Sequence, residues 1–95
     1  MTPVSSQAVA AFTVKQGQYL AFIHTYILLN RQPPAEADFQ RFFRVTPPSV
    51  HQMIVQLEKL GLIRRIPRQA RSIELLISAE HIPALQPIKT AVAKY

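Results

Sequence analysis

The sequence of 95 residues contains no cysteine and only two glycines. Without cysteine, the chain can form neither a disulfide framework nor a thiolate zinc site. Hydrophobic residues make up 48% of the chain, and this length suits one hydrophobic core. We therefore expect a single domain that folds without a metal ion or a disulfide.

Long apolar runs are also missing. A membrane-spanning helix needs about 20 mostly apolar residues, and no segment approaches that length. Residues 1–12 lack the basic segment and the apolar run of a signal peptide. We expect no membrane partner and a cytoplasmic protein.

The residue patterns of common enzyme sites are absent. The sequence shows no paired-carboxylate constellation, no nucleophile with a base beside it and no glycine-rich phosphate loop. His24 and His81 have no neighbours at the spacing of metal ligands. We expect that the chain is not an enzyme and that it holds no metal and no small-molecule cofactor.

Positive charge is concentrated between Arg41 and Arg71. This stretch has seven basic residues and one acidic residue, Glu58, which gives it a formal charge of +6, whereas the rest of the chain sums to zero. A localised excess of this kind is typical of a surface that binds a polyanion, most often a nucleic acid. From charge alone, a solvated basic face that aids solubility is the alternative.

Two helices are predicted in the first half of the chain. Thr13 and Gln16 form a capping-box pattern, so a helix begins at Val14 and ends before Pro33. Its core face is expected to carry Tyr19, Leu20, Ile23, Tyr26 and Ile27. A short helix over Ala35–Phe43 follows, with acidic residues in its first turn and apolar contacts from Phe39, Phe42 and Phe43.

A third helix and a hairpin are predicted after Val45. Thr46 is a typical helix cap and Pro47 a typical first residue, so the helix runs from Pro47 to about Leu60. Gly61 then adopts the left-handed conformation. The face expected in the core consists of Val50, Met53, Ile54, Leu57 and Leu60. Residues 62–66 and 72–77 read as two short strands around an arginine-bearing loop.

Three helices followed by a β-hairpin are the element order of a winged helix-turn-helix domain, a mainly α (α+β) fold. We expect a flexible arm over residues 1–12, the domain over 13–77, and a partly ordered tail over 78–95. In this motif the third helix enters the DNA major groove. No acidic residue lies between Asp38 and Glu58, so we expect the exposed face of that helix to be free of carboxylates, as close approach to phosphates requires.

Residues 13–76 resemble the N-terminal DNA-binding domain of LexA-type repressors. The motifs that carry the resemblance are Thr13-Val14-Lys15-Gln16, Pro33-Pro34, Thr46-Pro47-Pro48-Ser49, Leu57-Glu58-Lys59-Leu60-Gly61-Leu62-Ile63 and Ala70-Arg71-Ser72-Ile73-Glu74-Leu75-Leu76. The resemblance implies a regulator of transcription that binds double-stranded DNA.

Candidate contact residues follow from the third helix and the charged stretch. Position by position, the resemblance implies that bases are read by Thr46, Pro48, Ser49, His51 and Gln52. Gln56 joins them because it lies off the core face and can donate and accept hydrogen bonds. The candidates for the DNA backbone, from the helices and the wing, are Arg41, Arg44, Lys59, Arg64, Arg65, Arg68 and Arg71.

Two departures from the family pattern bear on function. LexA-type repressors have a self-cleaving peptidase domain, which this sequence does not reach, so we expect control by something other than autoproteolysis. Pro48 replaces the hydrogen-bonding side chain that the family usually has there, so we expect a different or less strict recognition sequence.

Two further alternatives stay open at the level of sequence. A single reading helix buries little surface, so a homodimer on a palindromic site is one arrangement. A winged-helix module that binds another protein through the hairpin and the Phe-bearing helix is the alternative to a DNA-binding regulator. An exposed phenylalanine ring on that helix would favour the protein-binding alternative.

Overall fold

A long helix, α2 (Val14–Asn30), forms the centre of the molecule in the computed structural model, which describes residues 12–87. The capping box is present, with the Thr13 hydroxyl accepting from the Gln16 amide and the Gln16 side chain accepting from the Thr13 amide. Arg31 ends the helix in the left-handed conformation. The helix prediction is confirmed, whereas the predicted N-terminal arm, apart from Phe12, and residues 88–95 lie outside the described residues.

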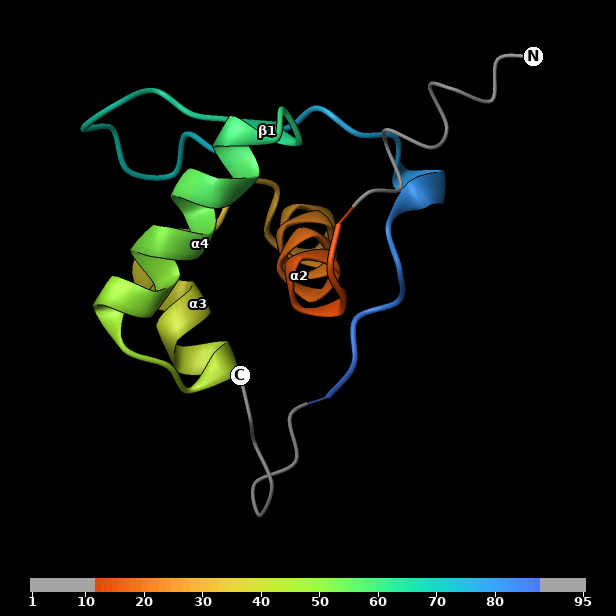
Figure 1. The fold of residues 1–95 in the computed structure, drawn as a ribbon, viewed down its shortest axis with the longest axis horizontal. Helices are drawn as coiled ribbons and strands as arrows, with labels where there is room; N and C mark the ends of the chain where they lie inside the picture. Colours follow the sequence, from red (N-terminus) through yellow and green to blue (C-terminus); the bar gives the residue numbers. More distant parts are fainter. Residues whose placement is uncertain (1–11, 88–95) are drawn as a thin grey trace.

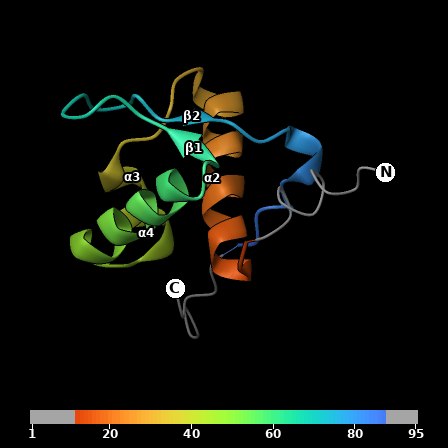
Figure 2. The same cartoon turned by 45° about the horizontal axis from the view of Figure 1, so that its top comes forward.

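The middle of α2 is buried on all sides, which the periodicity did not predict. Every residue from Gly17 to Ile23 is buried, because α3 and α4 cover one side and the segment after the hairpin passes along the other (Figures 1 and 2). Gln18 fixes this segment, donating to the carbonyl of Ala84 at 3.0 Å and accepting from the amide of Gln86 at 2.7 Å.

Helix α3 (Glu36–Phe43) packs on α2 through aromatic rings. Tyr19 stacks on Phe43 and Phe39, with ring centroids 4.4 and 5.4 Å apart. Phe39 and Phe43 are fully buried and Phe42 is half-buried against Phe22. No phenylalanine of α3 is therefore exposed as a docking ring.

Helix α4 (Pro47–Lys59) starts where Thr46 and the two prolines predict, and its buried face consists of Val50, Met53, Ile54 and Leu57. The expectation that Leu60 belongs to the core is wrong, since 52% of it is exposed. The helix ends one residue earlier, and Gly61 turns the chain at a φ of 76°. Leu62 consequently takes the core position that Leu60 would have filled.

The hairpin has shorter strands than predicted. Strand β1 (Ile63–Arg64) pairs antiparallel with β2 (Glu74–Leu75), in the register Ile63 to Leu75 and Arg64 to Glu74. Two loop residues, Arg68 and Arg71, have positive φ, so the chain leaves the extended conformation between the strands. A short 3-10 turn, η1 (Ala79–His81), follows β2. The winged helix-turn-helix prediction, three helices and a hairpin, is confirmed.

Candidate nucleic-acid interface

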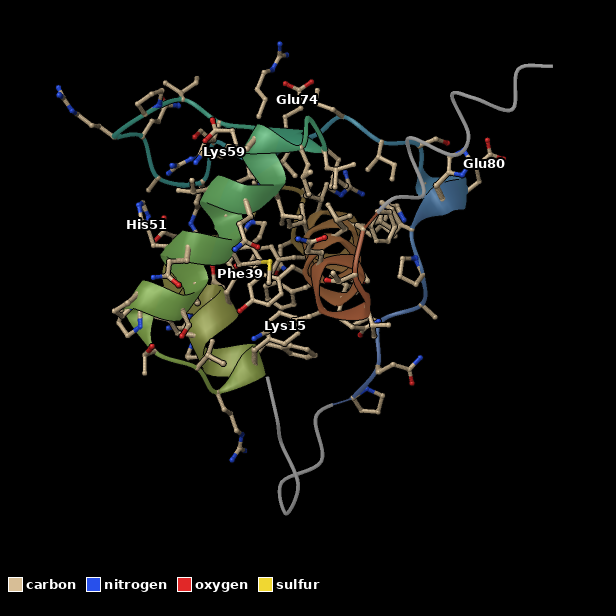
Figure 3. The ribbon with its side chains drawn as sticks, in the orientation of Figure 1. Lys15, Phe39, His51, Lys59, Glu74 and Glu80 are labelled. Carbon is tan, nitrogen blue, oxygen red and sulfur yellow. The ribbon has the colours of Figure 1, made fainter. Side chains whose placement is uncertain are left out.

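Helix α4 and the loop between the strands form one side of the molecule. Both extend away from α2, while η1 lies beyond the opposite side of α2 (Figure 2). His51 and Lys59 project from α4 on the side that faces away from α2 (Figure 3). The predicted reading helix is thus open to solvent beside the wing.

The first turn of α4 presents side chains rather than backbone amides. Pro47 and Pro48 have no amide hydrogen, and the amide of Ser49 donates to the Thr46 hydroxyl at 3.4 Å. The hydroxyls of Thr46 and Ser49 also bond to each other at 3.0 Å. A phosphate at this helix start would therefore meet the two prolines and a hydroxyl pair that is already bonded.

Among the polar base-contact candidates further along α4, only Gln52 has no bonding partner within the described residues. His51 Nδ1 lies 3.4 Å from a carboxylate oxygen of Glu36. Gln56 accepts from the side-chain amide of Gln16 at 3.4 Å. Gln52 is exposed, and no hydrogen bond or ion pair joins its side chain to another residue of 12–87, so it is free to donate to and accept from a base edge.

Val55 is a residue that the sequence analysis missed. It lies three positions after Gln52 and four before Lys59, so the three share one side of α4, opposite the core. The sequence did indicate where Val55 lies: position 55 falls outside the apolar spacing of residues 50, 54 and 57, so its side chain is not on the core face. A valine there can contact the methyl group of thymine.

The expectation of a carboxylate-free face is wrong at one position. Glu36 belongs to α3, but its carboxylate lies beside α4, 3.4 Å from His51 and 3.8 Å from Arg65. Glu36 comes before Asp38 in the chain, and the packing of α3 on α4 brings its carboxylate beside a stretch that has no acidic residue of its own between Asp38 and Glu58.

Four of the seven basic candidates pair with carboxylates of the protein. Arg64 lies 2.6 Å from Glu74, directly across the strand pair. Arg65 lies 3.2 Å from Glu58. Asp38 is shared by Arg41 and by Arg71, whose Nη1 lies 3.2 Å from Oδ2. The Arg64–Glu74 pair is exposed and contributes little stability, whereas Asp38 is buried. All of these pairs reduce the charge that the surface offers to a polyanion.

The other three basic candidates have no such partner within residues 12–87. Arg44 ends α3, Lys59 ends α4 and Arg68 lies in the wing loop. All three are exposed, and no hydrogen bond or ion pair joins their side chains to another described residue. They lie at both ends of α4 and beside it, which is where a duplex in contact with α4 would place phosphates.

Asp38 is a buried titratable group whose pKa is shifted by its surroundings. Burial raises its pKa, but the hydrogen bond from the Ala35 amide, the charges of Arg71 and Arg41, and the Tyr26 hydroxyl together lower it further than burial raises it. The net result is a pKa below the ordinary value for aspartate, so Asp38 is ionised at neutral pH.

Other kinds of site find no support in the described chain. Residues 12–87 contain no group of three or more His, Asp or Glu side chains that could hold a metal ion. Over the same range, no helix combines the length and apolar character needed to cross a membrane.

Comparison with known proteins points to one family. A family model described as the LexA DNA binding domain matches residues 9–72. The chain is 38% identical over 81 residues to the LexA repressor of Thermosipho melanesiensis and 35% identical over 81 residues to that of Thermosipho africanus. Each alignment covers 85% of this chain and 40% of the relative.

A third relative comes from another genus. The LexA repressor of Bartonella quintana is 35% identical over 71 residues, which cover 74% of this chain and 30% of the relative. The chain therefore spans less than half the length of these curated relatives, and the expectation about the peptidase domain stays a prediction.

The matched residues contain α2, α3, α4, β1 and the wing loop. The domain that they form is a DNA-binding domain and not a catalytic one, which confirms the expectation that this part of the chain is no enzyme. The chain belongs to the LexA DNA-binding domain family.

Proposed function

We propose that the chain is a transcriptional regulator that binds double-stranded DNA. Helix α4 reads base edges in the major groove, and the wing and the helix ends contact phosphates. The observation that carries this proposal is a set of three basic side chains with no bonding partner within residues 12–87. They are Arg44, Lys59 and Arg68, and they lie around the exposed face of α4. A protein that used its charge only for solubility would not need free cations at both ends of one exposed helix.

Base reading on α4 centres on Gln52. Its amide is free within the described residues, and a glutamine can bond to adenine through both its oxygen and its nitrogen. Thr46, Ser49, His51 and Gln56 each already use part of their hydrogen-bonding capacity within the protein. Pro48 and Val55 offer apolar contacts only. Few free polar groups favour a short or loosely specified recognition sequence.

A homodimer is part of the proposal. One α4 can cover only a few base pairs, and two copies on an inverted repeat would double the contacts and fix the spacing of the half-sites at about one or more helical turns. The dimer would act in the cytoplasm, where we expect its DNA to be.

Selection of bound duplexes from a random pool tests the proposal. The chain is incubated with the pool at low and moderate salt, and the retained duplexes are sequenced. We expect an enriched motif, present as an inverted repeat and retained at the higher salt. Retention without any enriched motif would contradict base reading, and no retention at low salt would contradict DNA binding itself. An enriched motif that is not repeated would contradict the dimer alone.

A further inference from the structure

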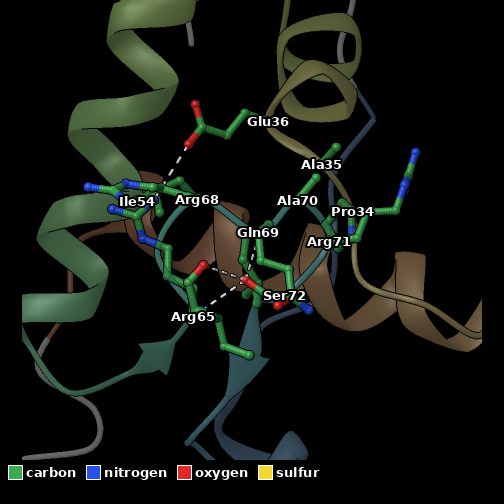
Figure 4. A pocket seen from close by; sticks show the side chains of 12 residues that line it. Pro34, Ala35, Glu36, Ile54, Arg65, Arg68, Gln69, Ala70, Arg71 and Ser72 are labelled. Atoms are coloured by element: carbon green, nitrogen blue, oxygen red, sulfur yellow. Dashed lines mark hydrogen bonds and ion pairs between the residues drawn. The ribbon is translucent and has the colours of Figure 1, made fainter.

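The wing loop lies over a cavity instead of packing on the helices. A pocket of about 290 Å³ separates the loop from α3 and α4. Its lining includes Ile54 and Ile73 from the core and Arg68 and Arg71 from the loop (Figure 4). Because little apolar surface supports the loop, its position relative to α4 depends on the contacts at its two ends.

Within itself, the loop is held by Ser72. The Ser72 hydroxyl accepts from the amide of Ile66 at 2.9 Å and lies within hydrogen-bond distance of the carbonyls of Ile66, at 3.2 Å, and Gln69, at 2.8 Å. These bonds join one end of the loop to the other. Residues 66–72 therefore form a loop that is closed by its own hydrogen bonds.

Arg71 attaches this loop to three other segments through one nitrogen. Its Nη1 lies 3.2 Å from Asp38 in α3, 3.1 Å from the Tyr26 hydroxyl in α2 and 3.2 Å from the carbonyl of Pro33 between them. Its guanidinium carbon lies 5.8 Å from the centre of the Tyr26 ring. Only 7% of Asp38 is exposed, so this ion pair is shielded from solvent on one side.

We infer that Arg71 and Asp38 are positioning residues, which hold the wing so that Arg68 meets a DNA phosphate, and that Arg71 itself makes no phosphate contact. This role rests on the proposed function, because the wing acts on DNA only if the chain binds DNA. Arg68 and Arg71 were equal candidates in the sequence. The structure separates them, since Arg68 has no partner in the described chain and Arg71 has three.

The Asp38→Asn variant distinguishes a role of Asp38 in positioning the wing from a simple effect of its charge on DNA binding. The new side-chain oxygen can still accept from the Ala35 amide, as Asp38 does at 2.8 Å, but the ion pairs with Arg71 and Arg41 are lost. The change also raises the net charge from +6 to +7, which by charge alone strengthens DNA binding. Glu80→Gln is the matched control, because it changes the net charge equally from η1, on the far side of α2 (Figure 3).

The affinity for duplex DNA is measured for the wild type and for four variants: Asp38→Asn, Glu80→Gln, Arg68→Ala and the double variant Asp38→Asn/Arg68→Ala. We expect Asp38→Asn to weaken binding by about fivefold to tenfold, the effect of one lost charge-assisted contact. The double variant should bind no more weakly than Arg68→Ala alone. Losses that multiply in the double variant, or an Asp38→Asn protein that binds as well as Glu80→Gln, would overturn the inference. Thermal unfolding confirms that each variant is folded at the temperature used.

A second measurement needs no DNA. The natural chain has no cysteine, so Gln69→Cys carries a single spin label in the wing loop, and the label broadens the amide NMR signals of nearby residues in α4. The Asp38→Asn and Arg71→Ala changes should alter this broadening, and Glu80→Gln should not. If the pattern is the same in all four proteins, the wing does not depend on Arg71. A wild-type chain that binds no duplex would contradict the proposed function, and the broadening would still decide the positioning role.

Discussion

At the scale of single residues, the polar base-contact candidates on and before α4 differ in whether their hydrogen-bonding atoms are already in use. Gln52 is free, whereas His51, Gln56 and the Thr46–Ser49 pair bond within the protein. The sequence predicted which residues point away from the core, because helical periodicity fixes direction. It did not predict which of these side chains already bond within the protein, because Glu36 and Gln16 reach α4 only through tertiary packing.

Gln52→Ala should weaken binding to the selected duplex by about 1 to 3 kcal/mol and leave binding to a shuffled duplex unchanged, because only the base contact is lost. Titration of both duplexes by fluorescence anisotropy measures this difference. Gln56→Ala is the matched control and should cost less, since Gln56 already bonds to Gln16. An equal loss on both duplexes would mean that Gln52 does not read bases.

Asp38 should also make the stability of the fold depend on acid. Its pKa is lower in the folded chain than in the unfolded chain, so its ion pairs contribute at neutral pH and that contribution is lost as the pH falls below about 4. Urea unfolding of the wild type and of Asp38→Asn, from pH 7 to pH 2.5, measures the difference in unfolding free energy. This difference should shrink below about pH 4. A difference that is constant with pH would contradict an ionised Asp38 in the folded state.

At the scale of elements, the helix starts were predicted well because each depends on neighbouring residues, such as Thr13 with Gln16 or Thr46 with Pro47. The burial of residues 17–23 of α2 on all sides was not predicted, since one side is covered by the segment that contains residues 84–86, which bond to Gln18 from more than 60 positions away. The strands were predicted too long for a related reason. The loop conformation depends on Ser72 and on two arginines at positive φ.

The end of α3 combines backbone strain with a proposed phosphate contact. Arg44 has a φ of 58°, a conformation that costs a non-glycine residue about 1 to 2 kcal/mol. Arg44→Gly should therefore be more stable than Arg44→Ala by about 1 kcal/mol, as measured by thermal unfolding. Both variants lack the guanidinium, so both should bind DNA more weakly than the wild type and to the same extent. A glycine variant that binds as well as the wild type would remove Arg44 from the interface.

At the scale of the whole molecule, the charge distribution pointed to α4 and the wing and overstated the charge that they leave unpaired. The segment with a formal charge of +6 does contain α4 and most of the wing. However, Arg41, Arg64, Arg65 and Arg71 pair with carboxylates, three of which, Glu36, Asp38 and Glu74, lie outside the segment. Folding brings these charges together across elements, which the order of residues alone does not reveal.

The salt dependence of binding to the selected duplex tests the central claim most directly, namely that α4 and the wing form one surface that holds DNA with three free cations. The account predicts that log Kd rises with log salt with a slope of about 3 for each bound chain, and that Lys59→Ala and Arg68→Ala each lower this slope by about 0.9. A wild-type slope near zero, or a slope that neither variant changes, would contradict it.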